Sequence, residues 1–362
     1  MPHAMMPSVT AEAGYVFSRA PRMIYWEMTR ACDLACRHCR AEAIAHRDPL
    51  ELTTAEARAM LDQIAGFGEP RPHVVCTGGD PLKRPDVLDV MAYGAGRGLG
   101  MSLAPSATAN LTPEIIRALR EAGMQSMSLS LDGATAERHD AFRGVAGCYD
   151  TTLQAARWVR DLEIPLQLNT LVTADTADDL PALYAVAEML GVMRWSLFFL
   201  IPVGRGRALR EITPLQAETV MQWMAEQAQE APFAIAATEA PHFRRVALAQ
   251  AQAAGQGPSG LRRSSIGRGF GIRDGNGVLF ISHHGEVTPA GFLPVVTGNV
   301  REDSVVDLYR GHEVFAALRD VARFTGKCGR CEYSALCGGS RARAFAHTGD
   351  YLASDPLCAY QP

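Results

Sequence analysis

Residues 23–39, MIYWEMTRACDLACRHC, join a short apolar run to three closely spaced cysteines. The run Met23–Trp26 predicts a buried strand, and the segment after it carries the spacing Cys32-x3-Cys36-x2-Cys39. Three thiolates can hold three irons of a 4Fe–4S cluster and leave the fourth iron open. An open iron can bind a substrate or cofactor, whereas a fully ligated cluster can only carry electrons.

Short apolar runs alternate with helical patterns from Met23 to about Glu230. The predicted strands are Met23–Glu27, His73–Cys76, Met101–Ala104, Ser126–Leu131, Leu166–Val172 and Trp195–Leu200. The predicted helices are Thr54–Gly66, Asp86–Gly96, Pro113–Glu121, Thr151–Asp161 and Asp179–Leu190, with a sixth from about Pro214. This alternation predicts an α/β fold: an open, partial (β/α)6 TIM-like barrel with its active site at the carboxyl ends of parallel strands.

The composition excludes several classes of protein. The chain has 362 residues, of which 48% are apolar, so a large buried core is expected. Its net charge of −4 argues against a nucleic-acid partner, and we expect no membrane span because no run of 18 apolar residues occurs. The segment Met1 to Val9 lacks the order of a signal peptide, which predicts a cytoplasmic protein. In a cytoplasmic protein, the nine cysteines are interpreted as metal ligands or buried thiols and not as disulfides. The isolated Cys76 and Cys148 are interpreted as packing residues.

Polar and glycine-rich motifs follow several predicted strands, where the active-site loops of such a barrel lie. Gly78-Gly79-Asp80-Pro81 follows the second strand, and glycines there let the backbone approach a ligand closely. At the end of the fourth strand, alternation directs Ser130 and Asp132 toward the cleft. Other candidates for ligand contacts are Ser106, Thr108, Asn110, Arg143, Asn169, Arg205 and Arg207. Arg143 can instead be a surface or capping residue, and the last two arginines can belong to a solvated turn.

A second group of cysteines, Cys328-x2-Cys331-x5-Cys337 followed by Cys358, lies near the C-terminus. Four thiols can close a site completely, and the spacing fits either structural zinc or an iron–sulfur cluster. Upstream, residues 251–260 (AQAAGQGPSG) predict a linker. Val278–Ser282 and Val287–Thr288 predict a hairpin around His284-Gly285.

Together these motifs resemble the radical S-adenosylmethionine (SAM) family, from about Met23 to Cys358. The resemblance implies a 4Fe–4S cluster on Cys32, Cys36 and Cys39 whose open iron chelates the amino and carboxylate groups of SAM. Asp80 stands where the family usually has glutamate, and His38 stands where it usually has an aromatic residue near adenine. The histidine ring can stack there or simply cover the cluster. The SAM-binding residues implied by the resemblance are Gly78, Gly79, Asp80, Ser106, Ser130, Asp132, Arg143 and Asn169.

The C-terminal part resembles the SPASM/twitch type of extension, which carries auxiliary 4Fe–4S clusters in this family. The resemblance assigns Cys328, Cys331, Cys337 and Cys358 to one auxiliary cluster. Ala290 and Ser340 stand where a second cluster would need cysteines, so one auxiliary cluster is expected and not two. The predicted organisation is an N-terminal tail at 1–20, the partial barrel at 21–235, a linker at 236–270 and a small C-terminal iron–sulfur domain at 271–362.

Within the family, the chain is most similar to enzymes of alternative haem and d1-type haem biosynthesis. The residues that carry this likeness are Trp26–Arg30, Cys39–Ala43, Thr77–Leu82 and Cys337–Leu352. The likeness implies reductive cleavage of SAM to a 5′-deoxyadenosyl radical that abstracts hydrogen from a substrate. It also implies electron transfer by the auxiliary cluster and a donor such as flavodoxin or ferredoxin. A carboxylate-bearing tetrapyrrole would suit Arg205, Arg207, Arg341 and Arg343, although the last two can instead surround the auxiliary cluster and tune its potential.

Other interpretations stay open at this point. The same architecture serves the maturation of ribosomally made peptides, although the roughly twenty residues before the first strand are too few for the peptide-recognition domain that such enzymes often carry. An electron carrier without SAM chemistry would leave Gly78-Gly79-Asp80 without a role. A binding protein with structural zinc at the C-terminal cysteines would be colourless after anaerobic purification.

Overall fold

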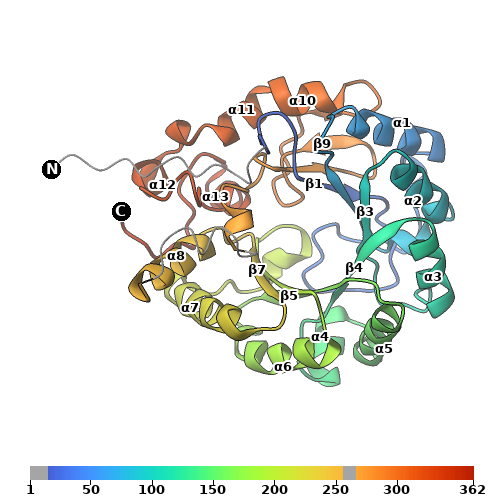
Figure 1. Ribbon diagram of the computed structural model, residues 1–362, viewed down its shortest axis with the longest axis horizontal. Helices are drawn as coiled ribbons and strands as arrows, with labels where there is room; N and C mark the ends of the chain where they lie inside the picture. Colours follow the sequence, from blue (N-terminus) through green and yellow to red (C-terminus); the bar gives the residue numbers. More distant parts are fainter. Residues whose placement is uncertain (1–14, 256–265) are drawn as a thin grey trace.

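The computed structural model describes residues 15–255 and 266–362. Most of the predicted N-terminal tail and half of the predicted 251–260 linker therefore lie outside the described residues. Within them, one ten-stranded sheet has the order β10-β9-β8-β1-β2-β3-β4-β5-β6-β7. Its central strands are parallel and curve around a common interior, with helices outside them (Figure 1).

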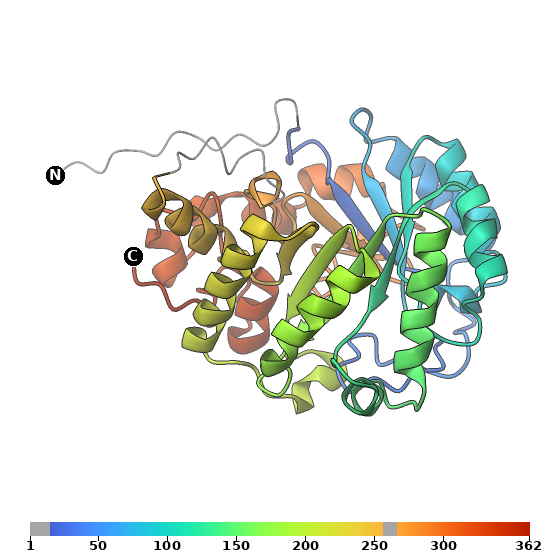
Figure 2. The ribbon, with the colours of Figure 1, turned by 60° about the horizontal axis from the view of Figure 1, so that its bottom comes forward.

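Strand–helix units build the first part of the chain. The strands are β1 (Met23–Glu27), β2 (His73–Thr77), β3 (Gly100–Leu103), β4 (Met124–Ser130), β5 (Leu166–Val172), β6 (Arg194–Phe199) and β7 (Ala234–Thr238). The helices are α1 (Thr54–Ala65), α2 (Val87–Gly96), α3 (Pro113–Glu121), α4 (Ala136–Arg143), α5 (Cys148–Asp161), α6 (Leu180–Leu190), α7 (Pro214–Glu230) and α8 (Phe243–Ala253). The α/β fold and the six predicted strands are confirmed, and the helices run alongside the strands on the outside (Figure 2).

Three elements differ from the sequence-based prediction. Residues 236–270, predicted as a linker, contain the end of β7 and the helix α8. The strand β7 extends the parallel sheet because it pairs with β6 in register, with Arg194 opposite Ala234 and Phe198 opposite Thr238. Helix α4 was also not predicted. It begins after the N-cap Thr135 and ends at Gly144, which has a left-handed backbone with φ of 73°.

The C-terminal part continues the same sheet. Strand β8 (Val278–Ile281) pairs in parallel with β1, and β9 (Glu286–Thr288) pairs antiparallel with β8, which confirms the predicted hairpin. Strand β10 (Gly298–Asn299) pairs with β9. This arrangement covers the edge of β1 that would otherwise expose unpaired backbone groups. The helices that follow are α10 (Val305–Gly311), α11 (Glu313–Arg319), α12 (Gly326–Arg330) and α13 (Arg341–Thr348).

Alternation along each strand separates the core from the barrel interior. On β4, Met127 and Leu129 are fully buried, whereas Ser126, Ser128 and Ser130 are half-buried on the other face. The interior face of β4 is therefore polar and partly exposed, which suits contact with a ligand. In the part of the chain that the structure describes, no helix has the length and apolarity needed to cross a bilayer.

Candidate active site

The three N-terminal cysteines lie on the loop that follows β1, at the carboxyl end of that strand. All three are free thiols. Each sulfur accepts a hydrogen bond: from Leu34 N to Cys32 Sγ (3.3 Å), from Ala43 N to Cys39 Sγ (3.3 Å) and from Arg143 Nη1 to Cys36 Sγ (3.7 Å). N–H donors directed at sulfur stabilise the thiolate form, which is the form that ligates metal. These three sulfurs therefore fit an iron–sulfur cluster with one iron left open.

The glycine pair after β2 is needed for contact with this cysteine loop. A Cβ atom on Gly79 would lie 2.4 Å from Ala31 O, and one on Gly78 would lie 2.4 Å from Thr29 O. Two short backbone hydrogen bonds connect the segments, from Gly79 N to Thr29 O and from Asp80 N to Ala31 O, both 2.7 Å. These glycines, predicted to let the backbone approach a ligand closely, also fix the start of the cysteine loop.

Asp80 and Ser106 reinforce the same junction. The Asp80 carboxylate is fully buried, accepts hydrogen bonds from Thr108 Oγ1 (3.0 Å) and Leu82 N (3.2 Å), and lies at the start of a short 3₁₀ helix, Pro81–Lys83. Burial raises its pKa above the ordinary value. Ser106 Oγ donates to the Gly79 carbonyl (2.9 Å) and lies 3.3 Å from Cys32 Sγ. Both residues thus position the loops after β1, β2 and β3.

Asp132 and Arg143 form a buried ion pair beside the cysteines. Arg143 Nη2 donates to Asp132 Oδ2, and Leu171 N donates to Asp132 Oδ1 (2.7 Å). Burial alone would raise the pKa of Asp132, but the Arg143 guanidinium, the nearby His38 and His139 and the Leu171 N–H together outweigh burial and hold this pKa below its usual range. The interpretation of Arg143 as a surface residue is wrong, because the side chain is buried with its Nη1 directed at Cys36.

Ser130 and Asn169 lie side by side on β4 and β5, where they are paired in register. Both are half-buried. Asn169 Oδ1 accepts a hydrogen bond from Gln167 Nε2 (2.8 Å). Together with the neighbouring serines of β4, they form a polar strip on the interior face of the barrel.

Helix α4 packs against the cysteine loop and contacts the ring of His38 in that loop. Ala35 N and Arg37 N donate to the last carbonyls of α4, at 3.2 and 3.0 Å. His38 stacks on Phe142 with ring centroids 4.9 Å apart and an interplanar angle of 17°. Burial, reinforced by the nearby Arg143, lowers the pKa of His38 to about 4, so its ring is neutral at physiological pH. The stacking expected of His38 is thus made with a protein ring in this structure.

The arginines after β6 differ from each other. They lie in a short 3₁₀ helix, Gly204–Ala208, in which Arg205 N donates to the carbonyl of Cys39 (3.1 Å). Arg205 Nε and Nη2 are buried and have no hydrogen-bond partner among the described residues. Arg207 is exposed. Arg205 therefore presents an unsatisfied cationic group next to the cysteine loop, where a carboxylate ligand would complete its hydrogen bonds.

The four C-terminal cysteines surround one cavity. Cys328, Cys331, Cys337 and Cys358 all line it, and all four are free thiols. Two backbone N–H groups donate to their sulfurs at 3.4 Å: Gly339 N to Cys337 and Asp355 N to Cys328. Burial raises the pKa of the Cys337 thiol to about 12, so ligation of a metal there must displace a proton. Four converging sulfurs with N–H donors fit a closed metal centre.

Arg341 and Arg343 are not available to a substrate. Arg341 is fully buried, and its Nη2 lies 3.6 Å from Cys328 Sγ while Nη1 donates to the carbonyl of Ala353 (2.7 Å). Arg343 is 1% exposed and pairs with Glu211 and Asp355. Their predicted role as ligands for substrate carboxylates is wrong because the fold already satisfies both guanidinium groups. For Arg341 the alternative interpretation, a position beside the C-terminal cysteines, is confirmed.

The structure also shows the surroundings of the two isolated cysteines, Cys76 and Cys148, and of Ser340. Cys76 is fully buried in the main core, as expected of a packing residue. Cys148 packs in a small cluster with Cys32 and Cys36, so it contributes to the wall of the first site, which its isolated place in the sequence did not indicate. Ser340 Oγ donates to Glu239 Oε2 (2.7 Å) and accepts from Arg343 N, as the N-cap of α13.

Known proteins are similar to this chain in both sequence and fold. A model of the "Radical SAM superfamily" matches residues 26–187. The chain is 41% identical to an AdoMet-dependent heme synthase from Methanosarcina barkeri, over 95% of this chain and 98% of the relative. It is 31% identical to a pre-heme d1 synthase from Dinoroseobacter shibae, over 93% of this chain and 85% of the relative. A PqqA peptide cyclase from Rhodopseudomonas palustris is 27% identical, over 94% of this chain and 88% of the relative.

A solved structure supports the same assignment of the fold. SuiB from Streptococcus suis, in a crystal structure bound to S-adenosylmethionine, aligns with a TM-score of 0.71 and 15% identity, over 94% of this chain and 78% of that chain. Enzymes of this superfamily use a 4Fe–4S cluster and SAM. The chain belongs to the radical SAM superfamily, on the branch that contains the AdoMet-dependent heme synthases.

Proposed function

We propose that Cys32, Cys36 and Cys39 hold the 4Fe–4S cluster and that the chain cleaves SAM at its open iron. The observation that carries this proposal is the cysteine loop itself, with three free thiols and an N–H donor for each sulfur. The cluster, when bound, supplies the electron that generates a 5′-deoxyadenosyl radical from SAM. The protein's contribution is to orient the ligands and exclude water.

The proposed SAM-binding residues divide into two groups by their contacts. Gly78, Gly79 and Asp80 shape the backbone beside the cysteine loop, and Ser106 joins them through the Gly79 carbonyl. The half-buried Ser130 and Asn169 offer free polar surface toward the barrel interior, which suits contacts to a ribose. We assign Asp132 and Arg143 to positioning, because the two side chains form an ion pair with each other and Arg143 Nη1 is directed at Cys36 Sγ.

We propose that the C-terminal cysteines hold one auxiliary 4Fe–4S cluster in a SPASM/twitch-like region. Support comes from the cavity that Cys328, Cys331, Cys337 and Cys358 share, and from the buried Arg341 directed at one sulfur. A positive charge beside a ligand sulfur favours the more reduced, more negative state of a cluster. That property suits acceptance of an electron from the substrate after hydrogen abstraction. Structural zinc is the competing occupant, because it also binds four thiolates.

For the substrate, we propose a carboxylate-bearing tetrapyrrole of the haem pathway. Two independent observations favour it. The first is 41% identity, over nearly the whole chain, to an AdoMet-dependent heme synthase, against 27% to a PqqA peptide cyclase. The second is the unsatisfied Arg205 guanidinium beside the cysteine loop, which can bind a carboxylate in bidentate fashion.

A peptide substrate is the second candidate. The fold is shared with SuiB, which has been solved bound to the precursor peptide SuiA. The polar strip of Ser126, Ser128 and Ser130 could receive an extended peptide as readily as a ribose. The lower identity to the peptide cyclase places this candidate second.

The test begins with anaerobic reconstitution, iron counting and an assay for 5′-deoxyadenosine in the presence of SAM and dithionite. About eight irons per chain are expected for two 4Fe–4S clusters, falling to about four in the Cys32/Cys36/Cys39 triple alanine variant, with cleavage lost. Iron coproporphyrin and a precursor peptide would then be compared as substrates by mass spectrometry. A product with a decarboxylated side chain from the porphyrin alone supports the haem assignment, and a modified peptide alone refutes it. Full iron without SAM cleavage would refute the proposed activity.

A further inference from the structure

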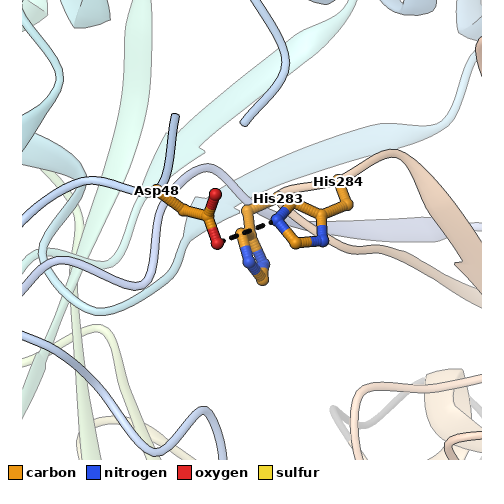
Figure 3. A group of neighbouring side chains, drawn as sticks. All are labelled: Asp48, His283 and His284. Carbon is orange, nitrogen blue, oxygen red and sulfur yellow. Dashed lines mark ion pairs between the residues drawn. The ribbon is translucent and has the colours of Figure 1, made fainter. Parts of the chain in front are cut away.

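A histidine pair and an aspartate meet at the carboxyl end of β1 and β8, outside both cysteine sites. His283 and His284 lie in the turn between β8 and β9, and Asp48 lies on the segment that leads from the cysteine loop to α1 (Figure 3). One ligand atom from each of the three residues lies within 4.8 Å of the others. We propose that Asp48, His283 and His284 bind a divalent first-row transition metal such as Zn²⁺.

His283 has the arrangement of a metal-ligating histidine. It is 7% exposed, and its Nδ1 lies 2.7 Å from Glu27 Oε1. Glu27 is paired with Arg40, so its carboxylate is an acceptor and Nδ1 carries the proton. The other nitrogen, Nε2, therefore has a free lone pair. It is buried and has no hydrogen-bond partner anywhere in residues 15–255 or 266–362. In many metal sites a carboxylate accepts a hydrogen bond from one ring nitrogen of a histidine and so orients the ring, while the other ring nitrogen binds the metal.

His284 and Asp48 supply the other two ligand atoms. His284 Nε2 lies 3.1 Å from Asp48 Oδ2, and this buried nitrogen makes no hydrogen bond of good geometry to any described residue. Metal–ligand bonds of about 2.0–2.1 Å place neighbouring ligand atoms about 2.9–3.4 Å apart, so this pair already has the spacing of two ligands on one ion. The rings of His283 and His284 are 4.0 Å apart between centroids, and the ligand atoms of all three residues lie within 4.8 Å of one another.

The backbone holds the two loops in this relation. Leu52 N donates to the carbonyl of His283 (2.9 Å), which connects the start of α1 to the β8–β9 turn. Leu50 N donates to Asp48 Oδ1 (2.9 Å), which leaves Oδ2 directed at His284. Preorganised ligands lose less conformational entropy when the ion binds.

The ligand set selects the class of ion. Two imidazoles and one carboxylate suit zinc, cobalt or ferrous iron, whereas calcium and magnesium prefer oxygen ligands throughout. Three protein ligands also leave a coordination position open for water or for a carboxylate. The site is distinct from the clusters because it has no sulfur ligand, so occupancy can be measured independently of them.

The test uses the full chain after anaerobic reconstitution, with iron content verified before zinc is added. One additional zinc per chain is expected, with an X-ray absorption shell of nitrogen and oxygen at about 2.0–2.2 Å and no sulfur shell at about 2.3 Å. Glu27→Gln, which removes the carboxylate charge that faces His283 Nδ1, is expected to weaken zinc binding about 10- to 100-fold. Asp48→Asn and His284→Ala alter partly exposed ligands, which favours a folded variant, and each should weaken binding at least as much.

His46→Ala is the matched control, because His46 is exposed and lies two residues before Asp48. It should bind zinc as the wild type does. Any of three results would overturn the proposal. The first is zinc bound only by sulfur ligands, the second is no zinc beyond that held by cysteine, and the third is zinc binding by Asp48→Asn with the affinity of the wild type. In those outcomes the 3.1 Å contact is an ordinary side-chain contact between His284 and Asp48.

Discussion

Replacement of Gly79 by alanine tests whether the glycine pair fixes the cysteine loop. Gly79 has a backbone conformation that other residues also adopt. Its replacement by alanine should therefore destabilise the chain through a steric clash of the added Cβ and not through backbone strain. The added Cβ would lie 2.4 Å from Ala31 O and 2.6 Å from Arg30 O, both backbone atoms that cannot rotate away. Ala31 directly precedes Cys32, so relief of the clash must displace the first cluster ligand.

The size of the effect follows from these distances. To reach an ordinary contact of 3.4 Å, the Ala31 carbonyl must move by about 1 Å from its present 2.4 Å. A shift of this size lengthens the 2.7 Å hydrogen bonds from Gly79 N to Thr29 O and from Asp80 N to Ala31 O beyond bonding range. Overpacking costs about 1–3 kcal/mol and each of the two lost hydrogen bonds about 0.5–1.5 kcal/mol, so the free energy of unfolding should fall by about 2–6 kcal/mol.

Urea unfolding of the cluster-free chain measures the change in stability, and iron content after reconstitution measures the displacement of Cys32. Gly96→Ala is the control, because Gly96 is exposed at the end of α2 and an added Cβ would meet no atom within 4 Å among the described residues. That change should stabilise the chain by about 0.4–1 kcal/mol. A Gly79→Ala chain with wild-type stability and full iron content would refute the reasoning.

Three further predictions concern Asp132, Cys358 and Glu239. Asp132→Asn leaves the Arg143 charge unpaired beside Cys36, and unfolding should show a loss of about 3–5 kcal/mol; an unchanged midpoint would contradict the ion pair. Cys358→Ser should reduce the iron count by about four per chain and leave SAM cleavage detectable, whereas an unchanged count would remove Cys358 from the cluster. Burial raises the pKa of Glu239 from 4.5 to about 8, so the folded state favours the neutral carboxyl and stability should fall as the pH rises between these values. Glu239→Gln should flatten that decline in thermal midpoints measured from pH 6 to 8, and an equal slope in both chains would contradict the assignment.

The sequence predicted the strands that build the site because their patterns are local. Each of the six predicted strands is a short apolar or alternating run, and the ends match the structure within two residues. The strand β7 was missed because its residues, AIAAT, are small and rich in alanine, a weak strand former. It is a strand because β6 offers an open edge, which no local pattern reports.

Spacing also explains which site residues could be predicted. Cys32, Cys36 and Cys39 lie within eight residues of each other, so their common function is visible in the sequence. His283 and Asp48 are far apart in the chain and come together only because β8 pairs with β1. The pairing of Arg143 with Asp132 likewise depends on how α4 docks, which its own sequence does not specify.

The arginines show why residue type alone does not identify a substrate-binding group. Arg143 and Arg341 are both buried, and each directs one guanidinium nitrogen at a cysteine sulfur, at 3.7 Å in the first site and 3.6 Å in the second. Arg143 Nη2 is paired with Asp132, whereas Arg143 Nε has no partner among the described residues, and the other donors of Arg341 are bonded to backbone carbonyls. Both charges therefore lie where they stabilise the cysteine sites. In Arg205, two buried nitrogens, Nε and Nη2, lack a partner among the described residues. Since a buried donor without a partner costs about 1–3 kcal/mol, its persistence is best explained by a ligand that completes it. The ion pair of Arg143 and the contact of Arg341 with Cys328 assign these two groups to the cysteine sites, and Arg205 is the arginine that we propose for binding a substrate carboxylate.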